Sequence, residues 1–337
     1  MKISGNPLPI HSLLNNALEA RLNLIGASQE SAIRLFNGFY EGYPDLVVDL
    51  YAQTLVIYNY ATIPQENTSV SLVFEHLYER LPWLQSAILK TRKATSLEER
   101  RGTYLMGTNF IHRIREHGLW YAIDLCMSQD ASLYLDTRNL RKWAIENLAK
   151  KTVLNAFAYT GSLGVAALGG GASMVVQVDL KRKFLNIAKG SYKYNGFSIN
   201  DADFIISDFF SAISHYKRTG ELFDCVFLDP PIHSTTKKGV IDMVSNSQRV
   251  VNKVRPLVRD RGYLVIINNA LYLSGADFMA ILKNMCSGGY LSIEALIPIP
   301  ADITGYATTR IDGPPVDPAP FNHPTKIVVL RVRRDSE

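Results

Sequence analysis

The second part of this chain alternates between apolar, strand-like runs and helical segments, and this rhythm restricts the fold more than any other feature. The strand-like runs begin at residues 152, 173, 202, 223, 262, 291 and 325. A segment with helical spacing separates each of the first five from the next, whereas no helix separates the last two. This alternation predicts an α/β fold with a doubly wound, Rossmann-like, mostly parallel sheet. Since the last connection carries no helix, we expect the final strand to insert antiparallel.

The residues before this region have a different pattern and predict a smaller α+β domain. A chain of 337 residues corresponds to about two domains. Residues 1–28 are expected to form a helical lead-in, and residues 29–128 a small α+β domain that ends in a β-hairpin at the turn REHGL. Residues 129–337 would form the α/β domain. Asp136 is expected to cap a helix over 136–150, and another helix is expected over 241–258.

Composition argues against several classes of protein. The chain is 47% hydrophobic and 20% charged, and it has no apolar run near the roughly 18 residues that cross a membrane. The cysteines, Cys126, Cys225 and Cys286, are scattered, so we expect neither a disulfide framework nor a metal site. The amino terminus has no pattern typical of a secretory signal. We therefore expect a cytoplasmic protein without a membrane partner.

Basic residues gather in one short region, within a chain whose net charge is +5. They are Lys90, Arg92, Lys93, Arg100, Arg101, Arg113 and Arg115. One interpretation is a solvated surface with salt bridges. The other is a footprint for RNA phosphates, with Tyr104, Phe110 and His112 as base-stacking groups. In that case Arg113 and Arg115 would bind substrate.

Ligands of doubly wound sheets bind at the carboxyl ends of the strands, so the residues there are candidates for a site. AYTGSLG follows the first strand and matches neither a dinucleotide loop nor a triphosphate loop. Asp179 lies 18 residues after Gly161 and can accept hydrogen bonds from a ribose, while Asp208 and Phe209 can contact an adenine. These groups suit an adenosine without phosphates and indicate S-adenosylmethionine as the cofactor. Taken singly, each aspartate could instead be a helix N-cap.

The fourth strand ends in Asp229, Pro230 and Pro231. Two prolines stop the ladder and stiffen the backbone. A rigid carbonyl beside a carboxylate can grip the edge of a nucleobase. A plain turn that ends the strand is the alternative.

The order of YLDTR, NAFAYTG, the acidic end of the second strand, SDFF and LDPP resembles the class I methyltransferases of large-subunit ribosomal RNA. These include 5-methylcytosine enzymes of the RlmI type and N7-guanine enzymes of the RlmK type. The resemblance runs from about residue 32 to the carboxyl terminus and includes the hairpin segment REHGLWYAIDL.

The resemblance implies a role for each matching position. Asp179 would bind the ribose of S-adenosylmethionine, Asp208 and Phe209 its adenine, and the DPP segment would be the catalytic loop. The segment that closes over the methionine end of the cofactor would be Tyr134, Leu135, Asp136 and Arg138. Its carboxylate and sulfonium region would be held by Phe157, Tyr159, Thr160 and Gly161.

The chain also departs from this family. Residues 1–28 take the place of an amino-terminal PUA-type RNA-binding domain, and SQDAS replaces a basic segment of the cofactor lid. The nucleophilic cysteine of the cytosine-5 enzymes is replaced by Asn268 and Asn269, which resembles the N7-guanine type. His233 stands where the family usually has an aromatic residue. It is either a base-stacking group or a loop histidine that faces solvent.

We therefore expect a methyltransferase that acts on a base nitrogen of ribosomal RNA, with Asp229, Pro230, Pro231, Asn268 and Asn269 as its catalytic residues. A small-molecule methyltransferase of the same fold is one alternative, and a non-catalytic cofactor-binding protein that associates with RNA is another. Both a monomer and a homodimer stay open. The long loop before the last strand supplies further substrate candidates, namely Tyr306, Arg310, Phe321, Asn322 and His323.

Overall fold

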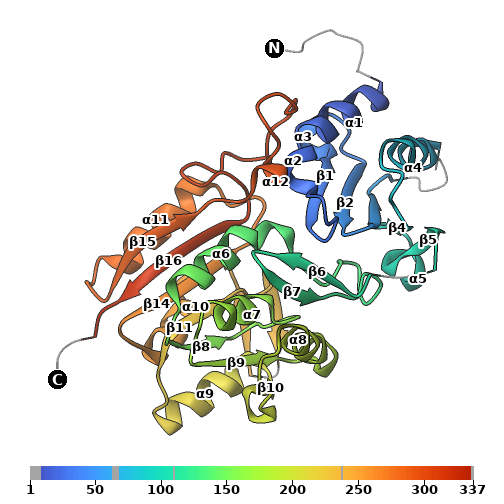
Figure 1. Ribbon diagram of the computed structural model, residues 1–337. Coiled ribbons are helices and arrows are strands. Elements are labelled where there is room, and N and C mark those ends of the chain that lie inside the picture. The colour runs from blue at the N-terminus through green and yellow to red at the C-terminus, as the bar shows by residue number, and fades with distance from the viewer. Residues whose placement is uncertain (1–8, 63–67, 109–110, 237, 335–337) are drawn as a thin grey trace. The chain divides into compact units, whose positions relative to one another are not determined.

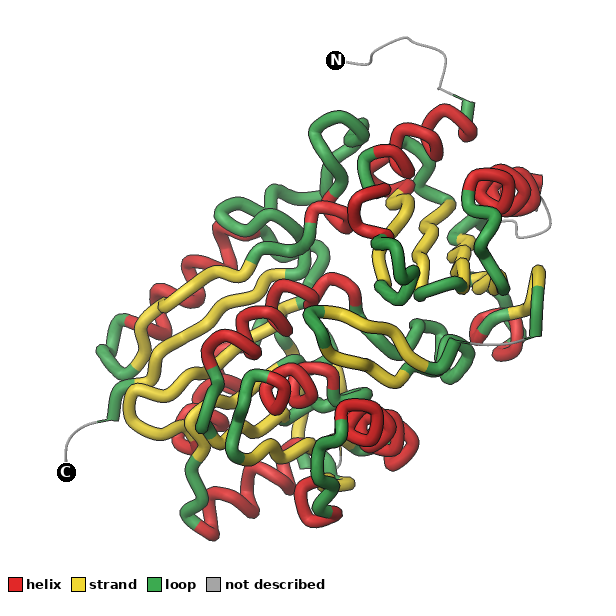
Figure 2. Tube along the Cα trace, in the orientation of Figure 1, coloured by secondary structure: helices red, strands yellow, loops and turns green. Residues whose placement is uncertain are grey.

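A computed structural model describes residues 9–62, 68–108, 111–236 and 238–334 of the chain. These residues divide into two compact units, each with a hydrophobic core. The first unit comprises residues 9–118, Ile123–Leu135 and Pro300–Pro314. The second comprises Leu119–Ala122, Asp136–Ile299 and residues 315–334. Figure 1 labels the elements, and Figure 2 distinguishes helices from strands.

The first unit is built on a five-stranded sheet. Its strands are β1 (Ala32–Asn37), β2 (Leu46–Tyr51), β3 (Thr54–Asn59), β4 (Ser86–Thr91) and β5 (Thr103–Met106), in that spatial order. Its helices are α1 (Ile10–Glu19), α2 (Leu22–Ile25), α3 (Gly38–Glu41), α4 (Thr68–Arg80), α5 (Leu97–Arg101) and α12 (Ala301–Thr304). Leu14 of α1 and Val73 of α4 share one core with strand residues such as Ile57. These helices therefore bury the apolar face of the sheet.

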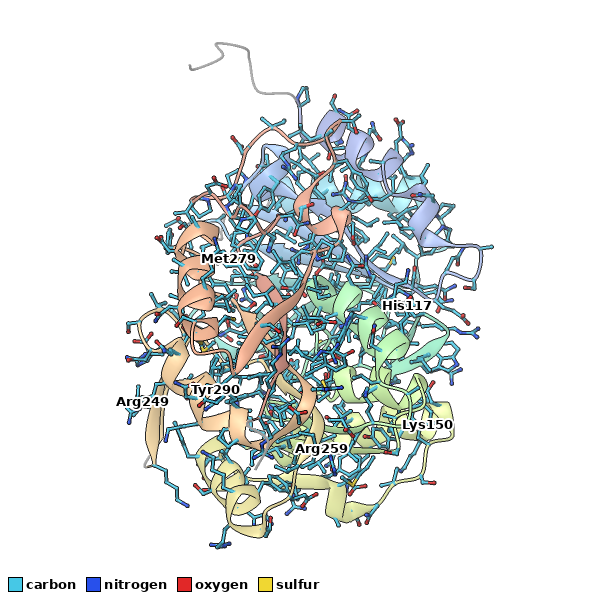
Figure 3. The ribbon with its side chains drawn as sticks, turned by 90° about the vertical axis from the view of Figure 1, so that its left-hand side faces the viewer. His117, Lys150, Arg249, Arg259, Met279 and Tyr290 are labelled. Atoms are coloured by element: carbon cyan, nitrogen blue, oxygen red, sulfur yellow. The ribbon has the colours of Figure 1, made fainter. Side chains whose placement is uncertain are left out.

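A β-hairpin forms at the turn REHGL, as expected from the sequence. It pairs β6 (Arg113–Glu116) with β7 (Leu119–Ala122). The two turn residues, His117 and Gly118, have φ angles of 51° and 82°. Positive φ at both positions is what a two-residue turn of type I′ requires. Figure 3 labels His117 at this turn.

The second unit contains a seven-stranded sheet in the order β10-β9-β8-β11-β14-β16-β15. The strands are β8 (Thr152–Asn155), β9 (Met174–Asp179), β10 (Phe204–Ile206), β11 (Phe223–Leu228), β14 (Val258–Asn268), β15 (Leu291–Ile297) and β16 (Lys326–Val332). β16 lies between β14 and β15 and is antiparallel to both. The predicted fold class, a doubly wound sheet with an antiparallel last strand, is confirmed.

Helices cover both faces of this sheet. They are α6 (Arg138–Asn147), α7 (Ser162–Gly169), α8 (Arg182–Asn195), α9 (Phe209–Thr219), α10 (Ser247–Val254) and α11 (Gly275–Cys286). Ile213 of α9, Val250 of α10 and Phe278 of α11 belong to one buried cluster on one face. α6, α7 and α8 are neighbours on the other face (Figure 1). The arrangement leaves the carboxyl ends of the parallel strands for ligands.

The helix expected over 241–258 is shorter than predicted. A small hairpin of β12 (His233–Thr236) and β13 (Gly239–Asp242) precedes α10, and a 3₁₀ turn at Arg255–Leu257 follows it. The carboxylate Oδ1 of Asp242 accepts from the backbone N–H groups of Val244 and Ser245, each at 2.9 Å. This local turn competes with the helix and delays its start.

The helix expected over 136–150 also begins differently. Asp136 lies within a 3₁₀ turn at Leu135–Thr137, and Thr137 is the residue before α6. Asp136 is therefore not an N-cap. Its Oδ2 accepts instead from Thr325 Oγ1 at 3.0 Å. The carboxylate thus contacts the residue that precedes β16.

Candidate active site

The loop after β8 turns sharply because two of its residues take left-handed backbone conformations. Tyr159 has a φ of 50° and Gly161 a φ of 77°. A Cβ atom at Gly161 would lie 2.5 Å from the Cβ of Ala188 on α8, so both the backbone and the neighbouring helix require glycine. The backbone N–H of Ala158 donates to the carbonyl of Val178 at 2.8 Å. The turn thus lies at the carboxyl ends of β8 and β9.

Asp179, the last residue of β9, holds this turn with its carboxylate. Oδ2 accepts from the backbone N–H of Tyr159 at 2.9 Å, and Oδ1 accepts from that of Lys181 at 2.9 Å. Burial raises the pKa of Asp179, and these backbone hydrogen bonds oppose that shift. A carboxylate offers about four lone-pair positions. Asp179 therefore keeps the capacity to accept hydrogen bonds from a ligand.

Two buried amides beneath the turn, Asn155 and Gln177, were not predicted as site residues. Gln177 Nε2 donates to the carbonyl of Gly161 at 3.1 Å, and Asn155 Nδ2 donates to Gln177 Oε1 at 2.9 Å. Within the described part of the chain, Oδ1 of Asn155 has no hydrogen-bond partner. The signal in the sequence is a polar residue inside each apolar strand run. These amides position the turn from below.

Two phenylalanines predicted to lie near the cofactor meet in the structure. The rings of Phe157 and Phe209 stack with centroids 4.8 Å apart and an interplanar angle of 24°. Asp208, predicted to contact adenine, caps α9, because its Oδ1 accepts from the backbone N–H of Ser211 at 3.0 Å. Its Oδ2 accepts from the Ser211 hydroxyl. The structure thus shows a capping role for Asp208, and its adenine contact stays a prediction.

The DPP segment places a carboxyl group beside an amide from the next strand. Asn269 Nδ2 donates to Asp229 Oδ1 at 3.3 Å. Burial, and next the nearby charge of Asp136, raise the pKa of Asp229 to about 7, while the hydrogen bond from Asn269 opposes the rise. Pro230 is buried and Pro231 is exposed. The site thus holds a half-buried carboxyl group that titrates near neutral pH.

The two adjacent asparagines have different roles. Asn268 is fully buried, its Nδ2 donates to the carbonyl of Met243 at 2.9 Å, and its Oδ1 accepts from the N–H of Ala270 at 2.9 Å. Asn269 is exposed. Asn268 therefore binds the backbone of Met243 and Ala270, whereas Asn269 donates a hydrogen bond to Asp229.

Lys326, at the start of β16, is a further residue that the sequence did not indicate. Its side chain is fully buried, and Nζ donates to the carbonyls of Ala270 at 3.0 Å and Pro324 at 2.6 Å. Burial lowers the pKa of Lys326 to about 8. This lysine ties the loop after β14 to the segment before β16.

The remaining predicted residues of the cofactor lid fall in both units. Tyr134 and Leu135 belong to the first unit, and Asp136 and Arg138 to the second. Tyr134 is 42% exposed, and its hydroxyl donates to Asp130 Oδ2 at 3.3 Å. Thr160 is buried in the turn after β8. The lid role of the first four residues and the contact of Thr160 with the carboxylate and sulfonium region of the cofactor stay predictions.

The substrate candidates of the second unit have mixed environments. His233 is exposed at the start of β12. Phe321 is buried beside Phe278, with ring centroids 5.7 Å apart. Asn322 pairs with both the N–H and the carbonyl of Ile299, each at 2.9 Å, and His323 Nδ1 accepts from the N–H of Thr325 at 3.0 Å. Phe321 and Asn322 therefore hold the loop in place. Phe321 is buried and Asn322 is exposed, and the contact of either residue with a substrate stays a prediction.

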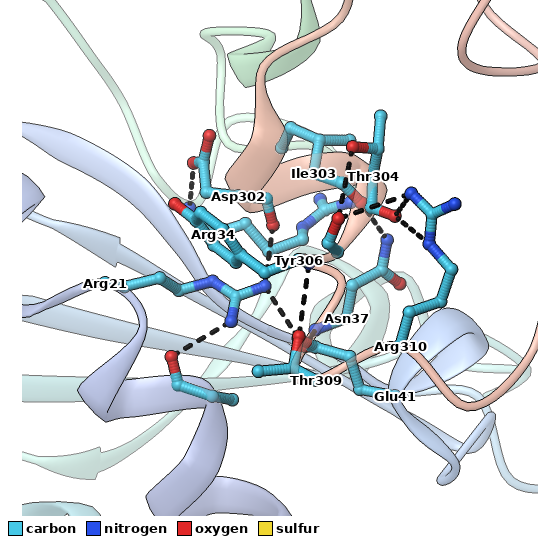
Figure 4. A network of polar contacts seen from close by, with 12 residues as sticks. Arg21, Arg34, Asn37, Glu41, Asp302, Ile303, Thr304, Tyr306, Thr309 and Arg310 are labelled. Atoms are coloured by element: carbon cyan, nitrogen blue, oxygen red, sulfur yellow. Dashed lines mark hydrogen bonds and ion pairs between the residues drawn. The ribbon is translucent and has the colours of Figure 1, made fainter.

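Tyr306 and Arg310 lie in the first unit, where they join a polar network around the buried Arg21 (Figure 4). Arg21 is fully buried and forms an ion pair of 2.9 Å with Glu41. Arg21 also lies over the ring of Tyr306 at 5.1 Å, and Arg310 donates to the carbonyl of Thr304 at 2.7 Å. The segment Pro300–Pro314 is thus part of the first unit's structure. Tyr306 is half-buried and Arg310 is exposed, and their contact with a substrate stays a prediction.

Only some of the basic side chains in the first unit's basic region are exposed. Lys90 is fully buried and donates to the carbonyls of Arg101 at 2.6 Å and Ser128 at 2.8 Å. Arg113 and Arg115 are exposed on β6, and Arg115 lies 3.9 Å from Glu30. Phe110 falls outside the described residues. The exposed arginines stay candidates for substrate contact, whereas Lys90 does not reach the surface.

Two kinds of feature are absent from the described residues. Across residues 9–62, 68–108, 111–236 and 238–334, no cluster of three or more His, Cys, Asp or Glu side chains could hold a metal ion. No helix in these same ranges is long and apolar enough to cross a membrane.

Comparisons with known families and proteins agree on one chemistry. A model of S-adenosylmethionine-dependent methyltransferases matches residues 33–287. Ribosomal RNA large subunit methyltransferase I of Photobacterium profundum is 31% identical over 285 residues, which are 83% of this chain and 70% of that protein. The protein of the same name from Aeromonas salmonicida is 32% identical over 66% of this chain and 57% of its own length.

Solved structures share the fold. The crystal structure of SMU.776, complexed with SAH, has a TM-score of 0.82 at 21% identity and covers 98% of this chain and 83% of that one. A tRNA m1G37 methyltransferase of M. jannaschii has a TM-score of 0.56 at 13% identity and covers 97% of this chain and 79% of its own. At these identities the likeness concerns the fold.

Proposed function

This chain belongs to the S-adenosylmethionine-dependent methyltransferase family, and we propose that it methylates a base nitrogen of ribosomal RNA, with guanine N7 favoured over cytosine C5. The observation that carries this proposal is the pair of Asp229 and Asn269. A carboxyl group and an amide meet at the carboxyl ends of adjoining strands, where a cytosine-5 enzyme needs a thiolate.

The residues of the second unit suit S-adenosylmethionine as the cofactor. The close turn at Gly161 and the acceptor oxygens of Asp179 lie at the carboxyl ends of β8 and β9. Leu180 directly follows β9 and is 62% exposed, and Ile206 ends β10 and is 43% exposed. These two side chains offer apolar surface for a purine ring. When bound, S-adenosylmethionine supplies an electrophilic methyl group on sulfur. Asp179 would accept hydrogen bonds from its ribose.

The acceptor nitrogen of the base needs orientation more than proton removal. A ring nitrogen such as N7 carries a lone pair, so alignment with the methyl group and sulfur can be sufficient. Ionised Asp229 would accept hydrogen bonds from N–H groups at the edge of the base. Asn269 donates to Asp229 and favours its ionised form. The rigid prolines 230 and 231 hold this loop.

The positions of the cysteines support a nitrogen acceptor. Cys225 lies inside β11 with no exposed surface, and burial raises the pKa of its thiol well above its ordinary value. Cys286 ends α11, and Cys126 lies in the first unit, where its Sγ is 3.2 Å from the Tyr104 hydroxyl. Neither follows β14. A thiolate attack on cytosine C6 therefore has no candidate among the described residues at that strand end.

Ribosomal RNA is proposed as the substrate on two grounds. The curated relatives carry the name ribosomal RNA large subunit methyltransferase I. Arg113 and Arg115 are exposed cations on β6 of the kind that contacts phosphates. The chain spans 70% and 57% of those relatives, so their substrate is a proposal for this chain and not a finding.

The test is transfer of a tritiated methyl group to ribosomal RNA taken from a host that lacks this protein. We expect transfer by the wild type and by a variant with Cys126, Cys225 and Cys286 replaced by Ser, and none by Asp229→Ala. Nuclease digestion of the product then names the base. Calorimetry with S-adenosylmethionine shows whether each variant still binds cofactor.

Each negative result has a defined meaning. Cofactor binding without transfer to RNA would replace this proposal by a small-molecule methyltransferase or a non-catalytic protein. Loss of transfer in a folded cysteine variant that still binds cofactor would restore the thiolate mechanism.

A further inference from the structure

We propose that a cationic depression between α9 and α10 binds the phosphodiester backbone of the RNA substrate. This inference rests on the proposed function and adds a second point of RNA contact, on the methyltransferase unit itself. The depression has a volume of about 500 Å³. It is lined by Lys217, Ser245, Asn246, Gln248, Arg249, Asn252 and Lys253.

The lining contains three cations and no acidic residue. Arg249 and Lys253 are four residues apart on α10 and so lie on one side of that helix. Lys217 comes from the last turn of α9. Figure 3 labels Arg249, whose side chain points outward from the ribbon. Lys217 and Arg249 are exposed and Lys253 is half-buried, so the site carries three positive charges from two helices.

These charges have no acidic partner in the described part of the chain. Among those residues, none of Lys217, Arg249 and Lys253 forms an ion pair, whereas several cations elsewhere in the unit do. Lys142, for example, lies 3.8 Å from Glu146 on α6. Burial and the nearby charge of Lys253 lower the pKa of Lys217. Uncompensated like charges at close range are unfavourable in the free protein, and a bound anion relieves that repulsion.

The other lining groups suit RNA better than a simple anion. Asn246, Gln248 and Asn252 are amides, each with both donor and acceptor atoms. Such groups can pair with the 2′-hydroxyl of ribose, which is itself donor and acceptor. Cations beside amides therefore match the alternation of phosphate and sugar along an RNA strand.

The depression connects to the catalytic loop through the chain. Ser245 and Asn246 form part of its lining, and Met243 is two residues before Ser245. The carbonyl of Met243 accepts the hydrogen bond from Asn268, which directly precedes Asn269. Ser245 and Asn246 thus belong to the same short segment as Met243, which Asn268 holds. Phosphate contacts there would fix the register of the RNA without reading its sequence.

The experiment measures RNA affinity against salt concentration with the full-length protein. The variant is Lys217→Gln/Arg249→Gln/Lys253→Gln. A control with the same loss of charge is Lys142→Gln/Arg261→Gln/Lys283→Gln, whose side chains are exposed and lie outside the depression. Filter binding uses fragments of unmethylated ribosomal RNA. Arg249→Gln alone serves if the triple variant does not fold.

Counterion release sets the expected size of the effect. Each phosphate contact to a single strand contributes about 0.7 to the slope of log affinity against log salt. The triple variant should therefore lose about 2 from that slope, and its affinity near 0.1 M salt should fall at least tenfold. The Arg249→Gln variant should lose about 0.7. The KM for RNA should rise while kcat and the affinity for S-adenosylmethionine stay unchanged.

Three results would overturn the inference. The first is a triple variant whose salt slope and KM for RNA equal those of the wild type. The second is a control variant that loses as much salt slope and RNA affinity as the triple variant. The third is a wild type that neither binds nor methylates ribosomal RNA. If the wild type methylates ribosomal RNA and either of the first two results is seen, this inference alone fails. If the wild type neither binds nor methylates ribosomal RNA, the proposed function fails and this inference fails with it.

Discussion

Replacing Asp229 by Asn should stabilise the protein at alkaline pH while it abolishes methyl transfer. The half-buried carboxyl group has a pKa of about 7, because burial and the charge of Asp136 disfavour its ionised form. In an unfolded chain the pKa is about 3.9. Ionisation therefore costs more in the folded state than in the unfolded state. The free energy of unfolding must fall as pH rises from about 4 to about 7.

The size of this effect follows from the pKa difference. A pKa of about 7 against about 3.9 corresponds to about 4 kcal/mol at pH values above both. Since Asp229 is not fully shielded from solvent, we expect about 2–4 kcal/mol in practice. Asparagine has the same shape and carries no charge, and its carbonyl oxygen can still accept from Asn269. The variant should thus gain about 2–4 kcal/mol relative to wild type at pH 8 and little at pH 4.

Urea unfolding between pH 4 and pH 8 measures this difference directly. Glu221→Gln, an exposed carboxylate in the same unit, is the control and should show no such pH dependence. A difference between Asp229→Asn and wild type that stays constant with pH, or that grows toward acid pH, would refute the reasoning. It would mean that Asp229 is ionised at ordinary aspartate pH values and is poorly shielded from water.

The same titration should appear in the rate of methyl transfer. If ionised Asp229 orients the base, kcat/KM should rise through a midpoint near pH 7. Asp136→Asn removes the like charge and should move that midpoint to lower pH. Asn269→Ala removes a hydrogen bond to the carboxylate and should move it to higher pH. Shifts in the same direction for both variants would contradict this account.

Three further predictions test other parts of the structure. Asp179→Ala should weaken S-adenosylmethionine binding at least tenfold in calorimetry, because a hydrogen bond to a charged acceptor is worth about 1.5–3 kcal/mol; an unchanged affinity would remove Asp179 from the site. Gly161→Ala should lose cofactor binding and lower the melting temperature more than Gly196→Ala, because both glycines have positive φ but only the Cβ at position 161 meets a neighbour. Arg21→Met should cost about 3–5 kcal/mol in urea unfolding because the buried Glu41 loses its cationic partner. A double variant with Glu41→Leu should recover most of this loss; an equal loss in the single and the double variant would show that the pair matters only through packing.

The role of the loops at the strand ends could be predicted in part from local sequence. A turn at AYTG followed by an acidic residue at the end of the next strand indicates a ligand site, because ligands of such sheets bind at the carboxyl ends of the strands. The structure adds that Asp179 also holds the turn itself. The adjacent asparagines could not be told apart from sequence, because neighbouring residues of a strand point to opposite sides. Burial of Asn268 and exposure of Asn269 depend on what packs on each side.

Other features of the site come from residues far apart in the chain. The amides Asn155 and Gln177 are 22 positions apart and meet only because β8 and β9 are neighbours in the sheet. Lys326 is buried against Ala270, 56 positions away. Polar residues inside apolar runs marked Asn155 and Gln177, but no spacing rule predicts which partners will form hydrogen bonds with them.

The sequence by itself determined the order along the chain of the strands of the seven-stranded sheet and the antiparallel last strand, but not the β12–β13 hairpin. This was possible because hydrophobic period and connection length are local properties that restrict the choice of sheet. Only the tertiary structure decided which segments are structural and which can meet a ligand. It placed Tyr306 and Arg310 in the polar network of the first unit, and it raised the pKa of Asp229 to about 7. Burial and the nearness of other charges set such properties, and both arise only when distant parts of the chain pack together.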